Sequence, residues 1–250
     1  MDVMKFCLVL CVVVATTYAR CNFPPRLWCS SKEIAKSCHV FQQCKEWNTP
    51  VQMAPPVNFT LYYESLCPDC KHFMTTMLYR VFQQIGHIMN LSLVPYGNAR
   101  ETKEGNHWKF ECQHGKQECV GNVIETCAIR LVNNIPKVFG FIHCMEKSIK
   151  LPLHAAKQCA KMYPNIPLNK VLLCANGTQG NEWEHQMALQ TQALQPPHQY
   201  VPWVTLNGIH TEEIQNEAEK DLLKLICDTY TGTKPSACHQ KESIRRCQNK

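Results

Sequence analysis

Two kinds of segment are missing from this sequence of 250 residues, and each absence excludes a class of protein. Beyond the first 19 residues, no stretch approaches the ~20 apolar residues that a membrane-spanning helix needs, so no membrane span is expected. No run of lysine and arginine occurs either, because the residues behind the formal net charge of +6 are interleaved with acidic ones. A nucleic-acid partner is therefore not expected.

The N-terminus is typical of a secretory signal. Lys5 supplies a positive charge, residues 6–15 form a short apolar core, and Thr17-Tyr18-Ala19 fits a cleavage site, which predicts a signal peptide over 1–19. Sequons for N-linked glycosylation begin at Asn58, Asn90 and Asn176. The sequence therefore predicts a glycosylated protein of the secretory pathway.

Cysteine is abundant, with 17 in the chain, of which Cys7 and Cys11 belong to the predicted signal peptide. Such a density in a secreted chain indicates disulfide bonds, whose pairing the spacing does not decide. The remaining number is odd, so one cysteine is free or is paired between chains. Cys238 and Cys247 in the tail are the candidates, and a disulfide-linked homodimer stays open.

Composition divides the mature chain into three parts. Residues 20–56 form a cysteine-rich head that ends in a proline-rich linker, residues 57–230 form the main domain, and residues 231–250 form a polar tail. The tail is expected to be poorly structured.

The start of the main domain predicts a βαβ unit. Apolar and polar residues alternate over 57–64, which predicts a strand. Apolar residues then recur every three or four positions over 71–89, which is typical of an amphipathic helix, and alternation returns over 91–96. The crossover between two such strands is expected to be right-handed.

The rest of the main domain is expected to be mostly helical. The predicted elements are a strand or extended segment over 108–112, helices over 118–190 interrupted at prolines, a strand over 201–206 and a closing helix over 212–230. Asn207-Gly208 predicts a two-residue hairpin turn, so Ile209-His210 should begin a returning strand. The fold class predicted is α/β with a disulfide-rich helical insertion.

Cys67-Pro68-Asp69-Cys70 stands where the first strand meets the first helix. The two-residue spacer brings both sulfurs into one helical turn, and unpaired N–H groups at the helix N-terminus stabilise a thiolate at Cys67. Cys67 would attack a substrate disulfide, and Cys70 would then resolve the mixed disulfide. This pattern predicts a thiol–disulfide oxidoreductase with Cys67 and Cys70 as catalytic residues and with no cofactor.

Two structural alternatives remain for this motif. It could be half of a zinc site, but no second Cys-x-x-Cys occurs, so no metal is expected. It could also be a buried structural disulfide, although the strand-to-helix context favours redox chemistry. Pro202 supports that chemistry, because a cis-proline faces the redox pair in thioredoxin-like folds and would contact substrate there. The alternative is a trans proline at the start of an edge strand.

The segment Cys112–Cys127 reads Cys-Gln-His-Gly-x2-Glu-Cys-x2-Asn-x4-Cys. With the redox motif, it resembles the gamma-interferon-inducible lysosomal thiol reductase family over roughly residues 57–230. The spacing of the head cysteines, with Trp28 before Cys29, is similar to a saposin A-type segment. His114 could be a proton shuttle or a substrate contact, but an exposed or hydrogen-bonded structural histidine is the favoured interpretation.

The resemblance implies a thioredoxin-like fold and reduction of protein disulfides in acidic endosomes and lysosomes, with possible secretion. It also implies a small-thiol or other reductant as partner, and trimming of both ends. Two other functions stay open. The chain could be a disulfide oxidase or isomerase of the secretory pathway, since exchange is reversible, or a secreted disulfide-rich binding protein without enzymatic activity.

Overall fold

The computed structural model describes residues 21, 23–24, 27–29, 31–48 and 54–239, so the predicted signal peptide and Cys247 lie outside the described residues. The chain divides into two compact units, Met1–Gln52 and Met53–Lys250. In the first unit, helices α2 (Lys32–Ser37) and α3 (Phe41–Asn48) follow one another, and Ser31 caps α2 by accepting the N–H of Ile34. Disulfides join Cys21 to Cys38 and Cys29 to Cys44.

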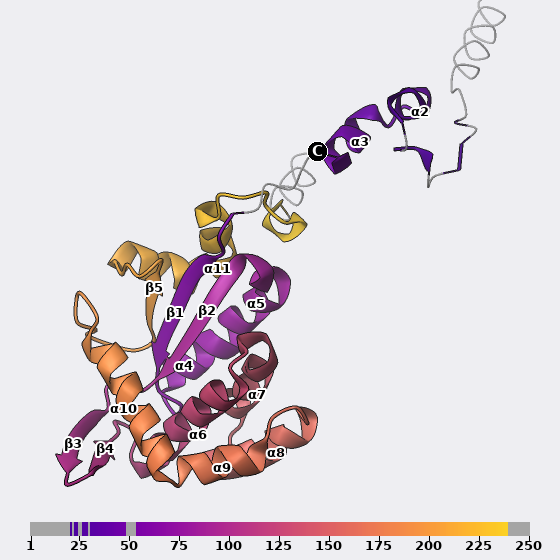
Figure 1. The fold of residues 1–250 in the computed structure, drawn as a ribbon. Helices are drawn as coiled ribbons and strands as arrows, with labels where there is room; N and C mark the ends of the chain where they lie inside the picture. Colours follow the sequence, from indigo (N-terminus) through magenta and orange to yellow (C-terminus); the bar gives the residue numbers. More distant parts are fainter. Residues whose placement is uncertain (1–20, 22, 25–26, 30, 49–53, 240–250) are drawn as a thin grey trace, which may run out of the picture. The chain divides into compact units, whose positions relative to one another are not determined.

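The second unit is built on a three-stranded sheet in the order β2-β1-β5 (Figure 1). Strand β1 (Val57–Tyr63) pairs in parallel with β2 (Met89–Pro95) and antiparallel with β5 (Trp203–Leu206). Every second residue of β1 is buried, as its alternation predicts. The parallel pairing confirms the predicted βαβ unit, because a parallel neighbour requires a crossover connection.

The crossover segment is helical but changes its winding along its length. It comprises α4 (Pro68–His72), the π-helical turn η2 (Phe73–Leu78), α5 (Tyr79–Ile85) and the 3-10 turn η3 (Gly86–Ile88). Apolar residues along it pack into the main core with those of the sheet. The amphipathic helix predicted over 71–89 is therefore present, with α4 beginning immediately after Cys67.

A second, two-stranded sheet follows β2. Its strands β3 (Arg100–Glu104) and β4 (His107–Glu111) pair antiparallel. Strand β4 corresponds to the extended segment predicted over 108–112. The sequence did not point to β3, because all five of its residues are polar or charged and no apolar alternation marks it.

Five helices form the disulfide-rich insertion between β4 and β5. They are α6 (Lys116–Val132), α7 (Ile135–Lys147), α8 (Pro152–Met162), α9 (Leu168–Ala175) and α10 (Thr178–Gln192). Figure 1 shows them gathered near the end of β1 that leads into α4. Disulfide Cys127–Cys174 joins α6 to α9, and Cys144–Cys159 joins α7 to α8. Pro136 and Pro152 lie in first helical turns, where the missing N–H costs no hydrogen bond.

The prediction of a returning strand at Ile209-His210 was wrong. The turn at Asn207-Gly208 forms, but the residues after it make only an isolated bridge, between Ile209 and Leu206, and not a strand. His210 folds back under β5, with Nδ1 2.8 Å from the carbonyl oxygen of Val204. Thr211 then caps α11 (Glu212–Thr229), so the chain enters the closing helix at once.

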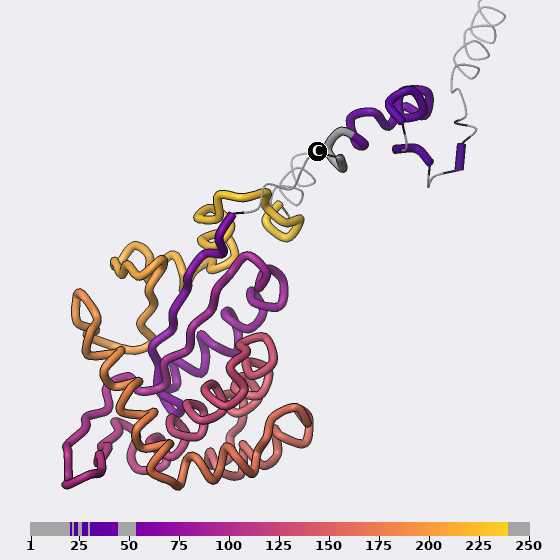
Figure 2. The backbone as a smooth tube through the Cα atoms, in the orientation of Figure 1, coloured from indigo at the N-terminus to yellow at the C-terminus, as the bar shows by residue number. Residues whose placement is uncertain are grey.

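The tail prediction was also wrong for residues 231–239. Ser236–His239 forms the 3-10 turn η4, and Cys238 is bonded to Cys227 of α11. In Figure 2 this yellow segment lies beside the start of β1, where the Tyr230 hydroxyl accepts the N–H of Ala54 at 3.3 Å. Cys238 is therefore not the unpaired cysteine. Within the described residues, no helix has both the length and the apolar character needed to cross a membrane.

Candidate functional site

Cys67 and Cys70 meet at the N-terminus of α4. Cys67 is the N-cap residue, Pro68 follows in the first turn, and the Cys70 N–H donates to Cys67 Sγ at 3.3 Å. Both are free thiols, and the other described cysteines are paired in disulfides. Cys67 is 5% exposed and Cys70 is completely buried, so Cys67 is the one within reach of a substrate.

The pKa values of the two thiols are shifted in opposite directions. A hydrogen bond from the Cys70 thiol lowers the pKa of Cys67, assisted by the backbone N–H groups of Cys70 and Asp69, and this outweighs burial and the nearby charge of Glu64. Burial, together with the interaction with Cys67, raises the pKa of Cys70 far above its usual range. The thiolate therefore forms at Cys67, which is the requirement for a nucleophile.

The segment that precedes β5 lies beside Cys67. The Val201–Pro202 peptide bond is cis, and the Val201 carbonyl oxygen lies 4.0 Å from Cys67 Sγ. Gln215 of α11 holds this segment, because its Nε2 donates to the Pro202 carbonyl oxygen and its Oε1 accepts the N–H of Val204, both at 3.0 Å. Sequence reasoning did not single out Gln215, which no local motif marks.

The segment between β1 and the redox pair is held by helix α6. Ser65 donates its N–H to Asn122 Oδ1 at 2.9 Å and its hydroxyl to the Glu118 carbonyl oxygen at 3.1 Å. Gly121 lies against the Ser65 side chain, and Cys112–Cys119 closes the loop before the helix. The motif over 112–127 thus has a physical role, which is to fix the backbone that carries Cys67.

His114 lies between two buried carboxylates. Its Nδ1 is 2.6 Å from Glu118 Oε2 and 3.3 Å from Glu64 Oε2. Glu118 Oε1 accepts the backbone N–H of His114, and Glu64 Oε1 accepts the backbone N–H of Asn98. Burial opposes protonation of His114, but Glu118 and Glu64 outweigh it and raise its pKa. His114 is thus hydrogen-bonded to a carboxylate beside the site, and the charge of Cys67 also contributes to its raised pKa.

The same three side chains are the candidate metal ligands in the described part of the chain. Glu64, His114 and Glu118 each offer one ligand atom, and these atoms lie within 4.8 Å of one another. The short hydrogen bond between His114 and Glu118 already occupies two of those atoms. We therefore interpret the cluster as an ion-pair network that anchors Glu64, three residues before Cys67.

Further carboxyl groups are buried behind the redox pair. Burial raises the pKa of Glu125 to about 7, and the Tyr63 hydroxyl donates to it. Burial and the charge of Glu125 raise the pKa of Glu146 well above its usual range. Glu184, which accepts the Thr126 hydroxyl at 2.7 Å, has a pKa raised in the same way by burial. The sequence pattern did not reveal these groups, because they lie on helices that otherwise read as ordinary amphipathic segments.

A methyl group at Gly121 should disturb the site through Ser65. A Cβ at this position would lie 2.8 Å from Ser65 Cβ and closer still to its hydroxyl. We expect Gly121→Ala to lower the free energy of unfolding by about 1–3 kcal/mol, as overpacking does in cores, measured by urea denaturation. Gln117→Ala, at an exposed position of the same helix, is the control. An unchanged stability in Gly121→Ala would contradict this close packing.

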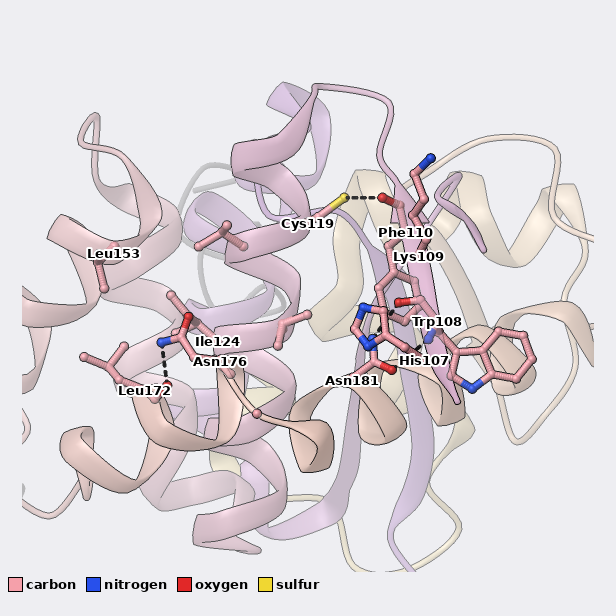
Figure 3. Close-up of a pocket in the computed structure, with 14 residues that line it drawn as sticks. His107, Trp108, Lys109, Phe110, Cys119, Ile124, Leu153, Leu172, Asn176 and Asn181 are labelled. Carbon is pink, nitrogen blue, oxygen red and sulfur yellow. Dashed lines mark hydrogen bonds between the residues drawn. The ribbon is translucent and has the colours of Figure 1, made fainter. Parts of the chain in front are cut away.

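The three predicted glycosylation sites are exposed on the described surface. Asn58 and Asn90 are neighbours across β1 and β2, and Asn90 Nδ2 donates to Asn58 Oδ1 at 2.8 Å. Asn176 lies at a pocket of about 350 Å³ between β4, α6 and the α9–α10 junction, where its Nδ2 donates to the Leu172 carbonyl oxygen (Figure 3). Their exposure is compatible with glycosylation, which stays a prediction.

Comparison with known proteins agrees with this geometry. The family model described as Gamma interferon inducible lysosomal thiol reductase matches residues 58–163. A protein of that name from Carassius auratus is 44% identical over 233 residues, which cover 92% of this chain and 90% of the relative. Another from Mus musculus is 37% identical over 213 residues, covering 84% and 82%.

Among solved structures, the MdbA thiol-disulfide oxidoreductase from Actinomyces oris superposes with a TM-score of 0.50 at 13% identity. The match covers 72% of this chain and 83% of that one. At this identity the likeness concerns the fold alone, and it supports the predicted thioredoxin-like fold with a helical insertion. On the strength of the sequence relatives, the chain belongs to the gamma-interferon-inducible lysosomal thiol reductase family and is a thiol reductase.

Proposed function

We propose that this thiol reductase reduces disulfides of unfolded or internalised proteins, using Cys67 as nucleophile and Cys70 as resolving thiol, in the acidic lumen of endosomes and lysosomes. The observation that carries the proposal is the position of Cys67. It is a thiol with a lowered pKa at a helix N-terminus, 4.0 Å from the carbonyl oxygen before cis-Pro202.

The reaction proceeds in two exchanges. The Cys67 thiolate attacks one sulfur of the substrate disulfide, forms a mixed disulfide and releases the other substrate sulfur as a thiolate, which takes up a proton. Cys70 then loses its proton and attacks Cys67 Sγ, which releases the second substrate thiol. The enzyme ends with a Cys67–Cys70 disulfide, and a small thiol or another reductant supplies two electrons to restore the pair.

An acidic lumen makes the low pKa of Cys67 important. A free cysteine with a pKa of ~8.5 is only about 0.03% thiolate at pH ~5, whereas a pKa of ~7 gives about 1%. The pKa of Cys67 is shifted in this direction, below that of a free thiol, mainly by the hydrogen bond from Cys70. The segment around Pro202 would hold the substrate, because it lines the side of Cys67 from which a disulfide approaches.

The location is proposed on separate grounds. The names of the relatives contain the word lysosomal, and the N-terminal pattern and the exposed asparagines Asn58, Asn90 and Asn176 suit a glycoprotein of the secretory route. The head is proposed to be a saposin A-like propeptide that is trimmed together with the tail. A disulfide-linked homodimer would have to use Cys247, since Cys238 is paired.

The deciding experiment measures both directions of exchange. We expect the enzyme, supplied with a small thiol, to reduce a denatured disulfide-bonded protein at pH ~5 and at pH ~7. Reduction confined to pH ~7 would refute the acidic setting. Failure to reduce at either pH, combined with oxidation of a dithiol peptide by the Cys67–Cys70 disulfide, would indicate a disulfide oxidase. Failure in both directions would indicate a binding protein.

A further inference from the structure

We propose that the groove beside Cys67 selects disulfides in which the attacked cysteine is flanked by lysine or arginine, with an apolar residue close by. The inference deepens the proposed function and rests on it. The ligand of the groove is a polypeptide segment of the substrate. It binds there because the groove adjoins the redox pair, and the acidic residues then select among substrates.

The groove has a volume of about 520 Å³ and lies between the two segments that frame the redox pair. Its lining includes Asp69, Phe73, Met77, Val201, Pro202 and Glu219. Asp69 belongs to the redox motif, and the Val201 carbonyl oxygen is 4.0 Å from Cys67 Sγ. A chain bound in this groove therefore passes beside the nucleophile.

Carboxylates stand on both sides of this groove. Asp69 is exposed in the first turn of α4, and Glu219 is exposed on α11. Gln215 orients Glu219, since the Nε2 group that donates to the Pro202 carbonyl oxygen also donates to Glu219 Oε1 at 2.7 Å. One carboxylate is thus attached to the cis-proline segment and the other to the redox motif.

A third carboxylate, that of Glu212, lies near Pro202, with His210 Nε2 3.8 Å from its Oε1. The Tyr200 hydroxyl, at the edge of the groove, donates to Glu212, with both carboxylate oxygens at 3.0 Å. Among the lining residues, His72 is the basic one. Lys71 does not line the groove, and its Nζ donates to the Ser148 carbonyl oxygen at 3.3 Å. The groove consequently favours a cationic side chain and repels an anionic one.

Apolar side chains line the groove as well. Phe73, Met77, Val201 and Pro202 are among the lining residues. In an extended substrate, a side chain within two residues of the cysteine lies within ~7 Å along the strand. The immediate neighbours of the attacked cysteine would thus be the residues that meet the carboxylates and this apolar surface.

The test uses three peptides of equal length, each carrying one cysteine in a disulfide with the same small fluorogenic thiol. The residue next to the cysteine is lysine, alanine or glutamate. We expect kcat/KM at pH ~5 to be about 5- to 10-fold higher for lysine than for glutamate, with alanine between them, as a few solvent-exposed charge pairs would produce. The ratio should fall toward one at high salt, because such pairs are screened.

Variants assign the preference to the groove. The double variant Asp69→Asn, Glu219→Gln should bring the lysine-to-glutamate ratio below about two. Glu104→Gln removes a carboxylate on the β3–β4 hairpin, outside the groove, and should keep the wild-type ratio. Equal rates for the three peptides, or a ratio unchanged in the double variant, would overturn the inference.

The alanine peptide separates this inference from the proposed function. If wild-type enzyme reduces it but shows no charge preference, the reductase proposal stands and the groove inference is wrong. If wild-type enzyme reduces none of the peptides and also fails on denatured protein, both are wrong.

Discussion

Replacement of Cys67 by serine is expected to lower the rate of protein disulfide reduction at least about 1000-fold, whereas Cys70→Ser is expected to trap the enzyme on its substrate. A serine hydroxyl does not form the anion that attacks sulfur at these pH values. In Cys70→Ser the nucleophile remains, but the thiol that resolves the mixed disulfide is lost. The two variants therefore fail at different steps.

The measurement pairs a turnover assay with mass spectrometry under non-reducing conditions. Cys70→Ser should gain the mass of the substrate, and reductant should remove it, while Cys67→Ser should form no such adduct. Thermal unfolding of each variant serves as the control for an intact fold. An adduct on Cys70 in the Cys67→Ser variant, at the wild-type rate, would reverse the assignment of nucleophile and resolving thiol.

The folded protein is also expected to be more stable in acid than at neutral pH. Burial raises the pKa of Glu125 to about 7 from an ordinary value of 4.5. The folded state then binds more protons than the unfolded state between these values. The contribution of Glu125 to stability is therefore complete below about pH 4.5 and is lost as the pH rises through about 7. A difference of this size corresponds to roughly 3 kcal/mol.

Glu125→Gln should remove the share of this dependence that Glu125 contributes, since glutamine cannot ionise and can still accept the Tyr63 hydroxyl. We expect the free energy of unfolding of wild type to fall by about 3 kcal/mol more than that of the variant between pH ~4.5 and ~8, measured by urea denaturation. Glu104→Gln, an exposed carboxyl in β3, should follow wild type. Identical pH profiles for wild type and Glu125→Gln would show that Glu125 does not carry the effect.

Buried carboxyl groups of this kind would suit the acidic setting proposed for the enzyme. Glu64, Glu125, Glu146 and Glu184 all have pKa values raised by burial. Each is closer to its neutral form in acid, so the cost of burying its charge decreases as the pH falls. His114 acts in the same direction, because its raised pKa means that the folded state holds its proton more tightly than the unfolded state does.

The redox motif and the elements around it were predictable because the information is local. The alternation of β1, the helical periodicity after it and the position of Cys67 at their junction are all properties of neighbouring residues. The cis-proline was predicted differently, from the position of a cis-proline in thioredoxin-like folds and the order of Pro202, strand and turn in this sequence, since an X–Pro bond alone is usually trans. The same local reasoning failed at Ile209-His210, where a tertiary contact of His210 with β5 diverts the chain into α11.

What the sequence by itself determined was thus the α/β class, the candidate redox pair, the abundance of disulfides and the likeness to a family of reductases. Only the tertiary structure decided which cysteines pair, why the motif over 112–127 matters and which charges surround the site. Asn122 reaches Ser65 across 57 positions, and Gln215 reaches Pro202 from another helix. Such contacts depend on how elements pack, and no periodicity within a segment encodes which distant side chain a buried polar group will meet.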